Sequence, residues 1–120
     1  MNKPLILAVE DDTAVRNLIT TTLETQDYRF HTAANGAQAI LEAASQKPDI
    51  MLLDVQMPHK DGIEVMQEAY RAGVLPCTII LSGYDEFRYA QQAIRLGARD
   101  YLLKPSRSSD ILKKLNAIAD

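Results

Sequence analysis

The chain has few of the residues that mark special classes of protein. Its 120 residues contain a single cysteine, Cys77, so no internal disulfide can form and nothing requires an oxidising compartment. Only 5 glycines and 5 prolines occur, which excludes collagen-like and low-complexity chains. The longest apolar run, Leu5–Val9, is far too short to span a membrane. The first residues lead straight into this run without a signal-peptide pattern, so we expect a cytoplasmic protein.

A basic excess is also missing. Lys and Arg number 13 against 16 Asp and Glu, which gives a net charge of −3 at pH 7. This balance argues against strong direct binding of nucleic acid, because such binding neutralises several phosphates. Hydrophobic residues make up 47% of the chain, which is typical of a globular domain that can bury its own core. We therefore expect one domain over residues 1–120.

Two kinds of hydrophobic pattern alternate along the chain. Strand-length apolar segments lie at Leu5–Val9, Ile50–Leu53, Thr78–Leu81 and, more weakly, Tyr101–Leu103, and Arg29–Thr32 alternates as an edge strand does. Apolar residues recur at helical spacing within 15–23, 37–44, 63–70, 87–94 and 111–119. Strict alternation of strands and helices predicts an α/β protein with a parallel sheet covered by helices on both faces.

Residues at the segment boundaries agree with this division. The expected helix N-caps are Asp12 or Thr13, Asn35, Asp61, Asp85 and Ser109. Gly73 and Gly97 stand where glycine commonly ends a helix.

Polar groups follow four of the five predicted strands. They are Glu10-Asp11-Asp12 after the first strand, Asp54 after the third, Ser82 after the fourth and Lys104-Pro105 after the last. In a parallel α/β sheet, ligands bind beyond the carboxyl ends of the strands. We therefore expect these side chains to share one edge of the sheet.

Their chemistry points to phosphoryl transfer. Carboxylates gathered at one edge repel one another unless a cation binds, and hard oxygen ligands favour Mg²⁺. A carboxylate beside that ion can attack phosphorus, and Asp54 is the natural nucleophile because it lies centrally while Glu10 and Asp11 flank it. The Lys104 ammonium and the Ser82 hydroxyl would then contact phosphoryl oxygens.

Each feature alone also has a purely structural interpretation. The three acids could simply begin a helix with favourable charge, and Ser82-Gly83 could be a turn. The functional interpretation rests on finding chemically suitable polar groups at four strand ends together. His31 and His59 lack partners at metal-ligand spacing, and Lys113-Lys114 is expected to be a solvated helix face.

Five motifs in chain order resemble those of response-regulator receiver domains, the phospho-acceptor part of two-component signalling. They are Val9-Glu10-Asp11-Asp12, Leu53–Pro58, Asp61-Gly62, Leu81–Tyr84 and Asp100–Pro105. The resemblance covers essentially the whole chain. It implies a flavodoxin-like (βα)5 three-layer sandwich with strand order 2-1-3-4-5.

The resemblance also implies a role for each site residue. Glu10 and Asp11 match the metal-binding acids, Asp54 the phosphorylated aspartate that also contacts Mg²⁺, and Gln56 the residue whose backbone carbonyl completes the metal shell. Lys104 matches the lysine of the family.

Two further positions match the family's switch. Ser82 corresponds to the hydroxyl that turns toward the phosphoryl group, and Tyr101 to the aromatic that changes rotamer. The bond between Lys104 and Pro105 is expected to be cis, which is feasible because proline follows. The change would reach the face formed by the 87–94 helix, the Tyr101–Leu103 strand and the last helix.

The implied partner is a histidine kinase or phosphotransfer protein, and the same face would suit a homodimer. No membrane and no nucleic acid bound by this domain are expected. Phosphorylation and hydrolysis would be self-catalysed, without a metabolic substrate, so the chain is not classed as an enzyme. Because the chain ends at Asp120 with its fifth helix, it either acts alone or is a module of a longer regulator.

The resemblance differs between the two halves. Residues up to Asp54 are similar to winged-helix-class receivers that control potassium-transport genes, and Ser82–Pro105 is similar to receivers of AraC-type regulators. A natural receiver and an engineered chimera both fit, and a chimera could be a scaffold without signalling. An aspartyl phosphohydrolase of the haloacid-dehalogenase type fits less well, because Gln56 replaces its second aspartate. An FMN carrier would need a phosphate-binding loop where three acids stand.

Overall fold

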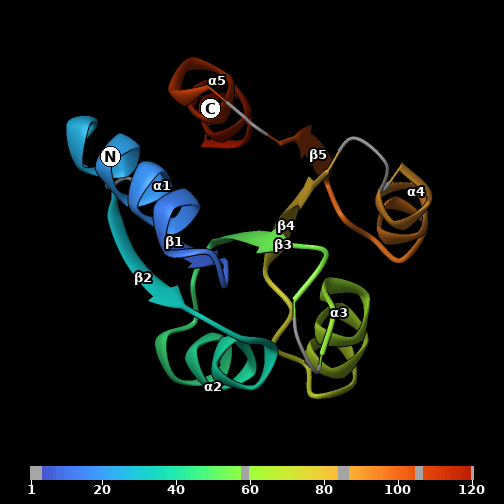
Figure 1. Ribbon diagram of the computed structural model, residues 1–120. Helices are drawn as coiled ribbons and strands as arrows, with labels where there is room; N and C mark the ends of the chain where they lie inside the picture. The colour runs from blue at the N-terminus through green and yellow to red at the C-terminus, as the bar shows by residue number, and fades with distance from the viewer. Residues whose placement is uncertain (1–3, 58–59, 84–86, 105–106, 120) are drawn as a thin grey trace.

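The fold is one parallel sheet with helices on both sides, seen in a computed structural model that describes residues 4–57, 60–83, 87–104 and 107–119 (Figure 1). The strands are β1 (Leu5–Val9), β2 (Arg29–Ala33), β3 (Ile50–Asp54), β4 (Cys77–Ser82) and β5 (Asp100–Leu103). The helices are α1 (Thr13–Thr25), α2 (Gly36–Gln46), α3 (Gly62–Arg71), α4 (Phe87–Arg95) and α5 (Ser108–Ala119). The sheet order is β2-β1-β3-β4-β5, which confirms the predicted flavodoxin-like (βα)5 fold.

Two apolar cores lie on the two faces of the sheet. In β1, Leu7 and Val9 join the core under α2, α3 and α4, whereas Ile6 and Ala8 join the core under α1 and α5. Figure 1 shows these two helix groups on opposite sides of the strands. Because both faces are covered, the central strands are apolar at nearly every position. The edge strand β2 is more exposed, as its alternating sequence predicts.

Polar side chains cap the N-termini of three helices, as predicted. Asp12, rather than Thr13, caps α1 by accepting from the backbone N–H of Val15. Asn35 caps α2, and Asp61 caps α3 in a capping box.

The remaining boundary predictions had different outcomes. Gly73 and Gly97 have φ values of 72° and 114°, so both take the left-handed conformation that glycine tolerates. The prediction for Ser109 is wrong, because α5 already begins at Ser108 and Ser109 lies in its first turn. Asp85 lies outside the described residues.

The register of the strands aligns their carboxyl ends. Val9 pairs with Leu53, and Asp54 pairs with Leu81. Beyond the last strand pairs, the Glu10 N–H donates to the Ala33 carbonyl at 3.0 Å, and the Lys104 N–H donates to the Ser82 carbonyl at 2.7 Å. The residues that follow β1, β3, β4 and β5 therefore meet at one edge of the sheet.

Helix α3 begins directly against the end of β3. The Gly62 N–H donates to the Val55 carbonyl at 2.8 Å. A Cβ atom on Gly62 would lie 2.7 Å from the Asp54 carbonyl oxygen and 2.9 Å from the Val55 Cα. These are backbone atoms, so they cannot swing aside as a side chain could. The close approach therefore requires glycine at position 62.

None of the helices in the described ranges has both the length and the apolar character needed to cross a bilayer.

We expect Gly62→Ala to lower the free energy of unfolding by about 1–3 kcal/mol, the usual cost of forcing an extra carbon into a packed site. Urea unfolding followed by circular dichroism measures this. The matched control is Gly73→Asn, since Asn tolerates the left-handed conformation and, apart from the two neighbouring residues, no described atom lies within 4 Å of a Cβ at that position. Equal stability of Gly62→Ala and the wild type would show that the contact is not a constraint.

Candidate functional site

Three carboxyl groups meet at the edge of the sheet. Carboxylate oxygens of Glu10, Asp11 and Asp54 all lie within 4.8 Å of one another. Glu10 and Asp54 are 0% and 1% exposed, whereas Asp11 is exposed. The second carboxylate oxygen of Glu10, Oε2, accepts from the Asp11 N–H at 3.1 Å, and Asp54 Oδ1 accepts from the Gln56 N–H at 3.2 Å. The site therefore concentrates negative charge at a place where little water can screen it.

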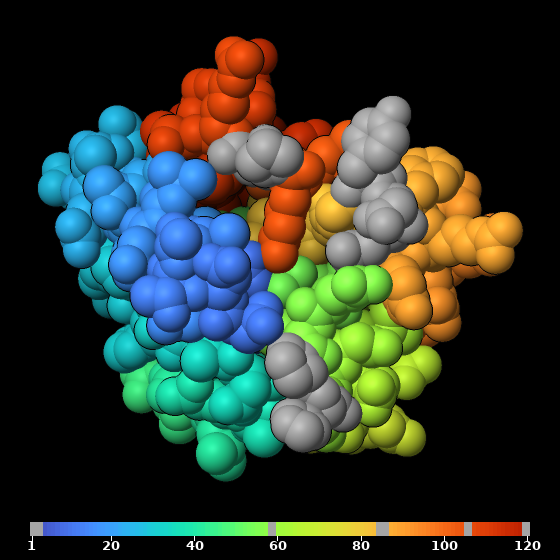
Figure 2. Space-filling model, in the orientation of Figure 1, coloured from blue at the N-terminus to red at the C-terminus, as the bar shows by residue number. Residues whose placement is uncertain are grey.

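Lys104 offsets part of this charge. Its Nζ lies 2.6 Å from Glu10 Oε1 and 2.9 Å from Asp54 Oδ1. In Figure 2 the blue, green and orange parts of the chain, which carry these three groups, meet on the face toward the viewer. One ammonium thus contacts two buried acids from neighbouring strands.

The pKa values of Asp54 and Lys104 reflect this arrangement. The pKa of Asp54 is raised to about 8, chiefly by burial and then by the neighbouring Glu10, against the opposing effect of Lys104. Burial alone would lower the pKa of Lys104, but the carboxylates of Glu10 and Asp54 outweigh it and raise that pKa. The lysine therefore stays charged, and an ionised Asp54 needs further positive charge beside it.

Ser82 presents a buried hydroxyl at the end of β4. Its side chain is 0% exposed, and its Oγ has no hydrogen-bond partner among the residues that the structure describes. A buried polar group without a partner costs about 1–3 kcal/mol. The hydroxyl is thus available to donate to an acceptor at this edge.

The donor set of the site suits a hard divalent cation. Glu10, Asp11 and Asp54 offer carboxylate oxygens, and the cluster contains no histidine or cysteine. Oxygen donors of this kind match Mg²⁺ rather than zinc or copper. A cation would also relieve the repulsion that raises the pKa of Asp54. The residues present therefore fit the magnesium site expected from the sequence.

Arg16 belongs to this site, although it was not among the residues predicted from the sequence. Its Nη1 donates to the backbone carbonyl of Glu10 at 2.8 Å. That carbonyl is part of the peptide that joins Glu10 to Asp11, so the first turn of α1 is tied to the acidic turn. The available signal was an arginine four residues after the helix N-cap. A pattern of residue types cannot reveal its target, because that target is a backbone atom.

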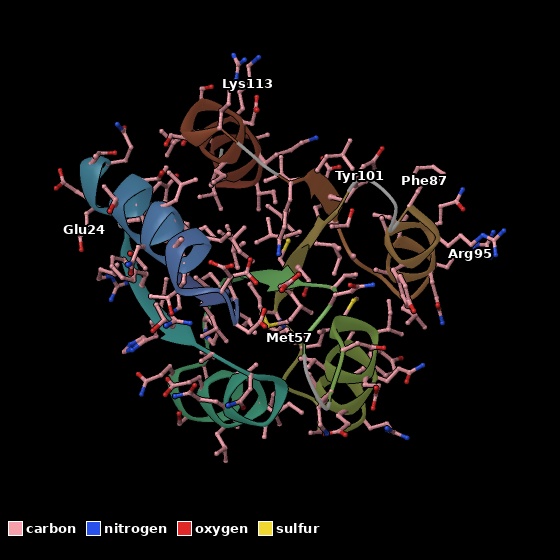
Figure 3. The ribbon with its side chains drawn as sticks, viewed as in Figure 1. Glu24, Met57, Phe87, Arg95, Tyr101 and Lys113 are labelled. Atoms are coloured by element: carbon pink, nitrogen blue, oxygen red, sulfur yellow. The ribbon has the colours of Figure 1, made fainter. Side chains whose placement is uncertain are left out.

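Tyr101 lies on β5, three residues before Lys104, and is not part of the cluster of acids. It is half-buried on β5, and its ring contacts that of Phe87 edge-to-face, with 6.5 Å between the centroids (Figure 3). Gln56 is exposed, and its backbone N–H donates to Asp54 Oδ1.

The other side chains singled out in the sequence had mixed outcomes. His31 is exposed. Lys113 is exposed as predicted, whereas Lys114 is only partly exposed and its Nζ lies 2.6 Å from Asp100 Oδ2, an ion pair that the sequence did not predict. The cis bond predicted before Pro105 falls outside the described residues, as does His59.

Comparison with known proteins identifies the family. Residues 6–116 match the family model of the response regulator receiver domain. The alkaline phosphatase synthesis transcriptional regulatory protein PhoP of Bacillus subtilis is 34% identical over 118 residues, which cover 98% of this chain and 49% of that protein. The KDP operon transcriptional regulatory protein KdpE of Escherichia coli is 36% identical over 110 residues, which cover 92% of this chain and 48% of that protein.

Solved structures agree. A CheY-like response regulator receiver domain protein from Methanospirillum hungatei superposes with a TM-score of 0.90 at 26% identity, covering 100% of this chain and 95% of that chain. The chain belongs to the response regulator receiver domain family. It spans about half the length of PhoP and KdpE, and those relatives are transcriptional regulators rather than metabolic enzymes.

Removing the charge of Asp54 should stabilise the protein most at high pH. The pKa of Asp54 rises from 3.8 to about 8 on folding, so the folded state keeps a proton that the unfolded state loses, and stability falls as pH rises through that window. In EDTA, we expect Asp54→Asn to gain at least about 1.4 kcal/mol over the wild type at pH 8, the equivalent of one pKa unit. The gain should be clearly smaller at pH 5, because only the lower part of that pH window has then been crossed.

Thermal unfolding at both pH values measures the difference. Glu24→Gln is the control, because Glu24 is exposed and lies in the last turn of α1 (Figure 3), whereas Glu10 and Asp11 precede the first turn of that helix. A larger loss of stability for Asp54→Asn at pH 8 than at pH 5 would mean that the Lys104 ion pair outweighs burial, contrary to this prediction.

Proposed function

We propose that residues 1–120 act as one phospho-accepting switch in which Asp54 receives a phosphoryl group from a histidine kinase or phosphotransfer protein. The observation that carries this proposal is the buried Asp54 carboxylate, with two further acids within 4.8 Å and the Lys104 ammonium in contact. A purely structural ion pair would not need three acids around one lysine. Membership of the receiver family supports the same function.

Mg²⁺ would be held by the carboxylates of Glu10, Asp11 and Asp54 and by the backbone carbonyl of Gln56. When bound, it supplies positive charge to the oxygens of the transferring phosphoryl group. Arg16 holds the Glu10–Asp11 peptide through the carbonyl of Glu10, so it acts as a positioning residue for the acids.

The transfer itself uses the residues of the chain in defined roles. An Asp54 carboxylate oxygen attacks phosphorus, the phosphorus–nitrogen bond of the phosphohistidine breaks, and its electron pair returns to the imidazole nitrogen, which is then protonated. Lys104 neutralises charge on a phosphoryl oxygen, and the Ser82 hydroxyl donates to another. Water later cleaves the acyl phosphate, which restores Asp54 and releases inorganic phosphate.

The phosphoryl group would change a distant face. Movement of Ser82 toward it frees space that Tyr101 takes up, and the face formed by α4, β5 and α5 responds. That face carries Phe87 and Leu103, which are 50% and 46% exposed, so a partner or a second copy of the chain could bind there. Binding of DNA is assigned to no residue of this chain, and the cytoplasm is the compartment proposed for the switch.

Acetyl phosphate with Mg²⁺ should add a single phosphoryl group to the protein, because the site supplies both nucleophile and charge. Intact-mass spectrometry measures the adduct. We expect it to vanish in Asp54→Asn and in EDTA, and to form many times more slowly in Lys104→Met.

Asp110→Asn is the matched control, since this exposed acid lies at the start of α5 and should leave the adduct intact. The proposal fails if no adduct forms and beryllofluoride also leaves the spectrum of the folded protein unchanged. In that case a scaffold or a chimera without signalling describes the chain better.

The positioning role of Arg16 gives a separate prediction. We expect Arg16→Met to weaken Mn²⁺ binding several-fold, even though the substitution removes a positive charge near the acids. Arg16→Lys should recover most of the affinity, because it keeps a donor of similar length. The free-ion signal of Mn²⁺ in electron paramagnetic resonance measures binding without reference to phosphorylation.

Arg29→Met, an exposed site on β2, serves as the control for general charge effects. Equal or tighter Mn²⁺ binding by Arg16→Met would rule out a positioning role, since loss of charge alone would then dominate.

A further inference from the structure

A groove lies between α3 and α4 and takes no part in the proposed reaction. It encloses about 480 Å³ and is lined by Met66, Gln67, Tyr70, Arg71, Arg95 and Leu96. In each β–α unit the helix begins at the carboxyl end of the strand and runs back, so the last turns of α3 and α4 lie at the other end of the sheet from Asp54. Because Arg71 and Arg95 lie in those last turns, the groove is remote from the acids.

The groove is positive although the chain as a whole is negative. Arg71 and Arg95 are exposed, and neither forms an ion pair with any described residue. In Figure 3, the side chain of Arg95 extends outward from α4. No acidic residue is among those that line the groove, whereas the net charge of the chain is −3. Two guanidinium groups are therefore available to carboxylates from outside the molecule.

The groove also exposes an aromatic and an aliphatic side chain. Tyr70 is 73% exposed and Leu96 39% exposed, while the thioether of Met66 is buried beneath them. Tyrosine, arginine and methionine are enriched at protein interfaces, and aspartate, glutamate and lysine are depleted there. Helix C-termini favour arginine for electrostatic reasons, but that preference does not account for an exposed tyrosine and leucine beside it.

We propose that this groove binds an acidic peptide segment of a partner protein, with an aromatic or aliphatic side chain seated against Tyr70, Leu96 and Met66. Carboxylates on either side of that anchor would pair with Arg71 and Arg95. Binding requires no phosphorylation, so the proposal stands or falls independently of Asp54.

Selection from a phage-displayed random peptide library on the unphosphorylated protein tests this proposal. We expect the enriched peptides to carry Asp or Glu on both sides of an aromatic or aliphatic residue. The affinity of a selected peptide, measured by fluorescence anisotropy, should fall about tenfold or more in the double variant Arg71→Glu/Arg95→Glu. Tyr70→Ala should weaken it several-fold, and circular dichroism confirms that each variant is folded.

The control is Arg29→Glu/Lys113→Glu, which changes the net charge equally at exposed positions on β2 and α5 and should bind like the wild type. Three results would overturn the proposal: no enriched peptide, enriched peptides without an acidic excess, or equal loss of affinity in both double variants. A dimer in sedimentation velocity, or binding to phosphatidylserine vesicles, that is abolished only by Arg71→Glu/Arg95→Glu would assign the groove to a second copy or to a membrane instead.

Discussion

The contact of one ammonium with two buried carboxylates is the constraint on which the rest of this structure depends. Lys104 lies 2.6 Å from Glu10 and 2.9 Å from Asp54, and the two acids come from the adjacent strands β1 and β3. Removing a charge from water costs several kcal/mol unless a partner offsets it. Burial and then the neighbouring Glu10 raise the pKa of Asp54 although Lys104 opposes them, so one lysine does not offset the cost of ionising this acid. The three acids outnumber the one lysine at this edge, and this excess of negative charge is what a divalent cation would relieve.

The apolar sheet makes that imbalance sustainable. β1, β3 and β4 are buried on both faces, so their carboxyl ends are held in a fixed register and the polar groups cannot move apart to reduce repulsion. Gly62 contributes in the same way, because only a residue without a side chain lets α3 begin against the Asp54 peptide. The hydrophobic free energy of two cores thus stabilises a local arrangement that is unfavourable by itself. Arg16 adds a local restraint on the turn that carries Glu10 and Asp11.

Much of the fold and of the site was predictable, and the exceptions share one physical cause. Strand and helix boundaries follow from periodicity and local capping, so β1 and the N-caps Asp12, Asn35 and Asp61 could be predicted from nearby residues. The gathering of Glu10, Asp54 and Lys104 followed from the topology of parallel sheets. The pairing of Lys114 with Asp100 and the bond from Arg16 to a backbone carbonyl depend on three-dimensional contacts that no period encodes. The error at Ser109 is of another kind, since α5 begins one residue earlier, at Ser108, whose hydroxyl pairs with that of Thr22 on α1.

The polarity of the helices connects the two ends of the molecule. The amino ends of α1 and α3 lie near Asp54, where their partial positive charge would favour an anion such as the proposed phosphoryl group. Their carboxyl ends, and that of α4, lie at the opposite edge and favour cations, so Arg71 and Arg95 can stand unpaired there at little cost to folding. The arginines alone would therefore say nothing about a partner. Tyr70 and Leu96 carry the inference, because helix polarity gives no reason to expose an aromatic ring and a leucine beside them. A surface of this composition is stabilised when apolar contact and carboxylates arrive together.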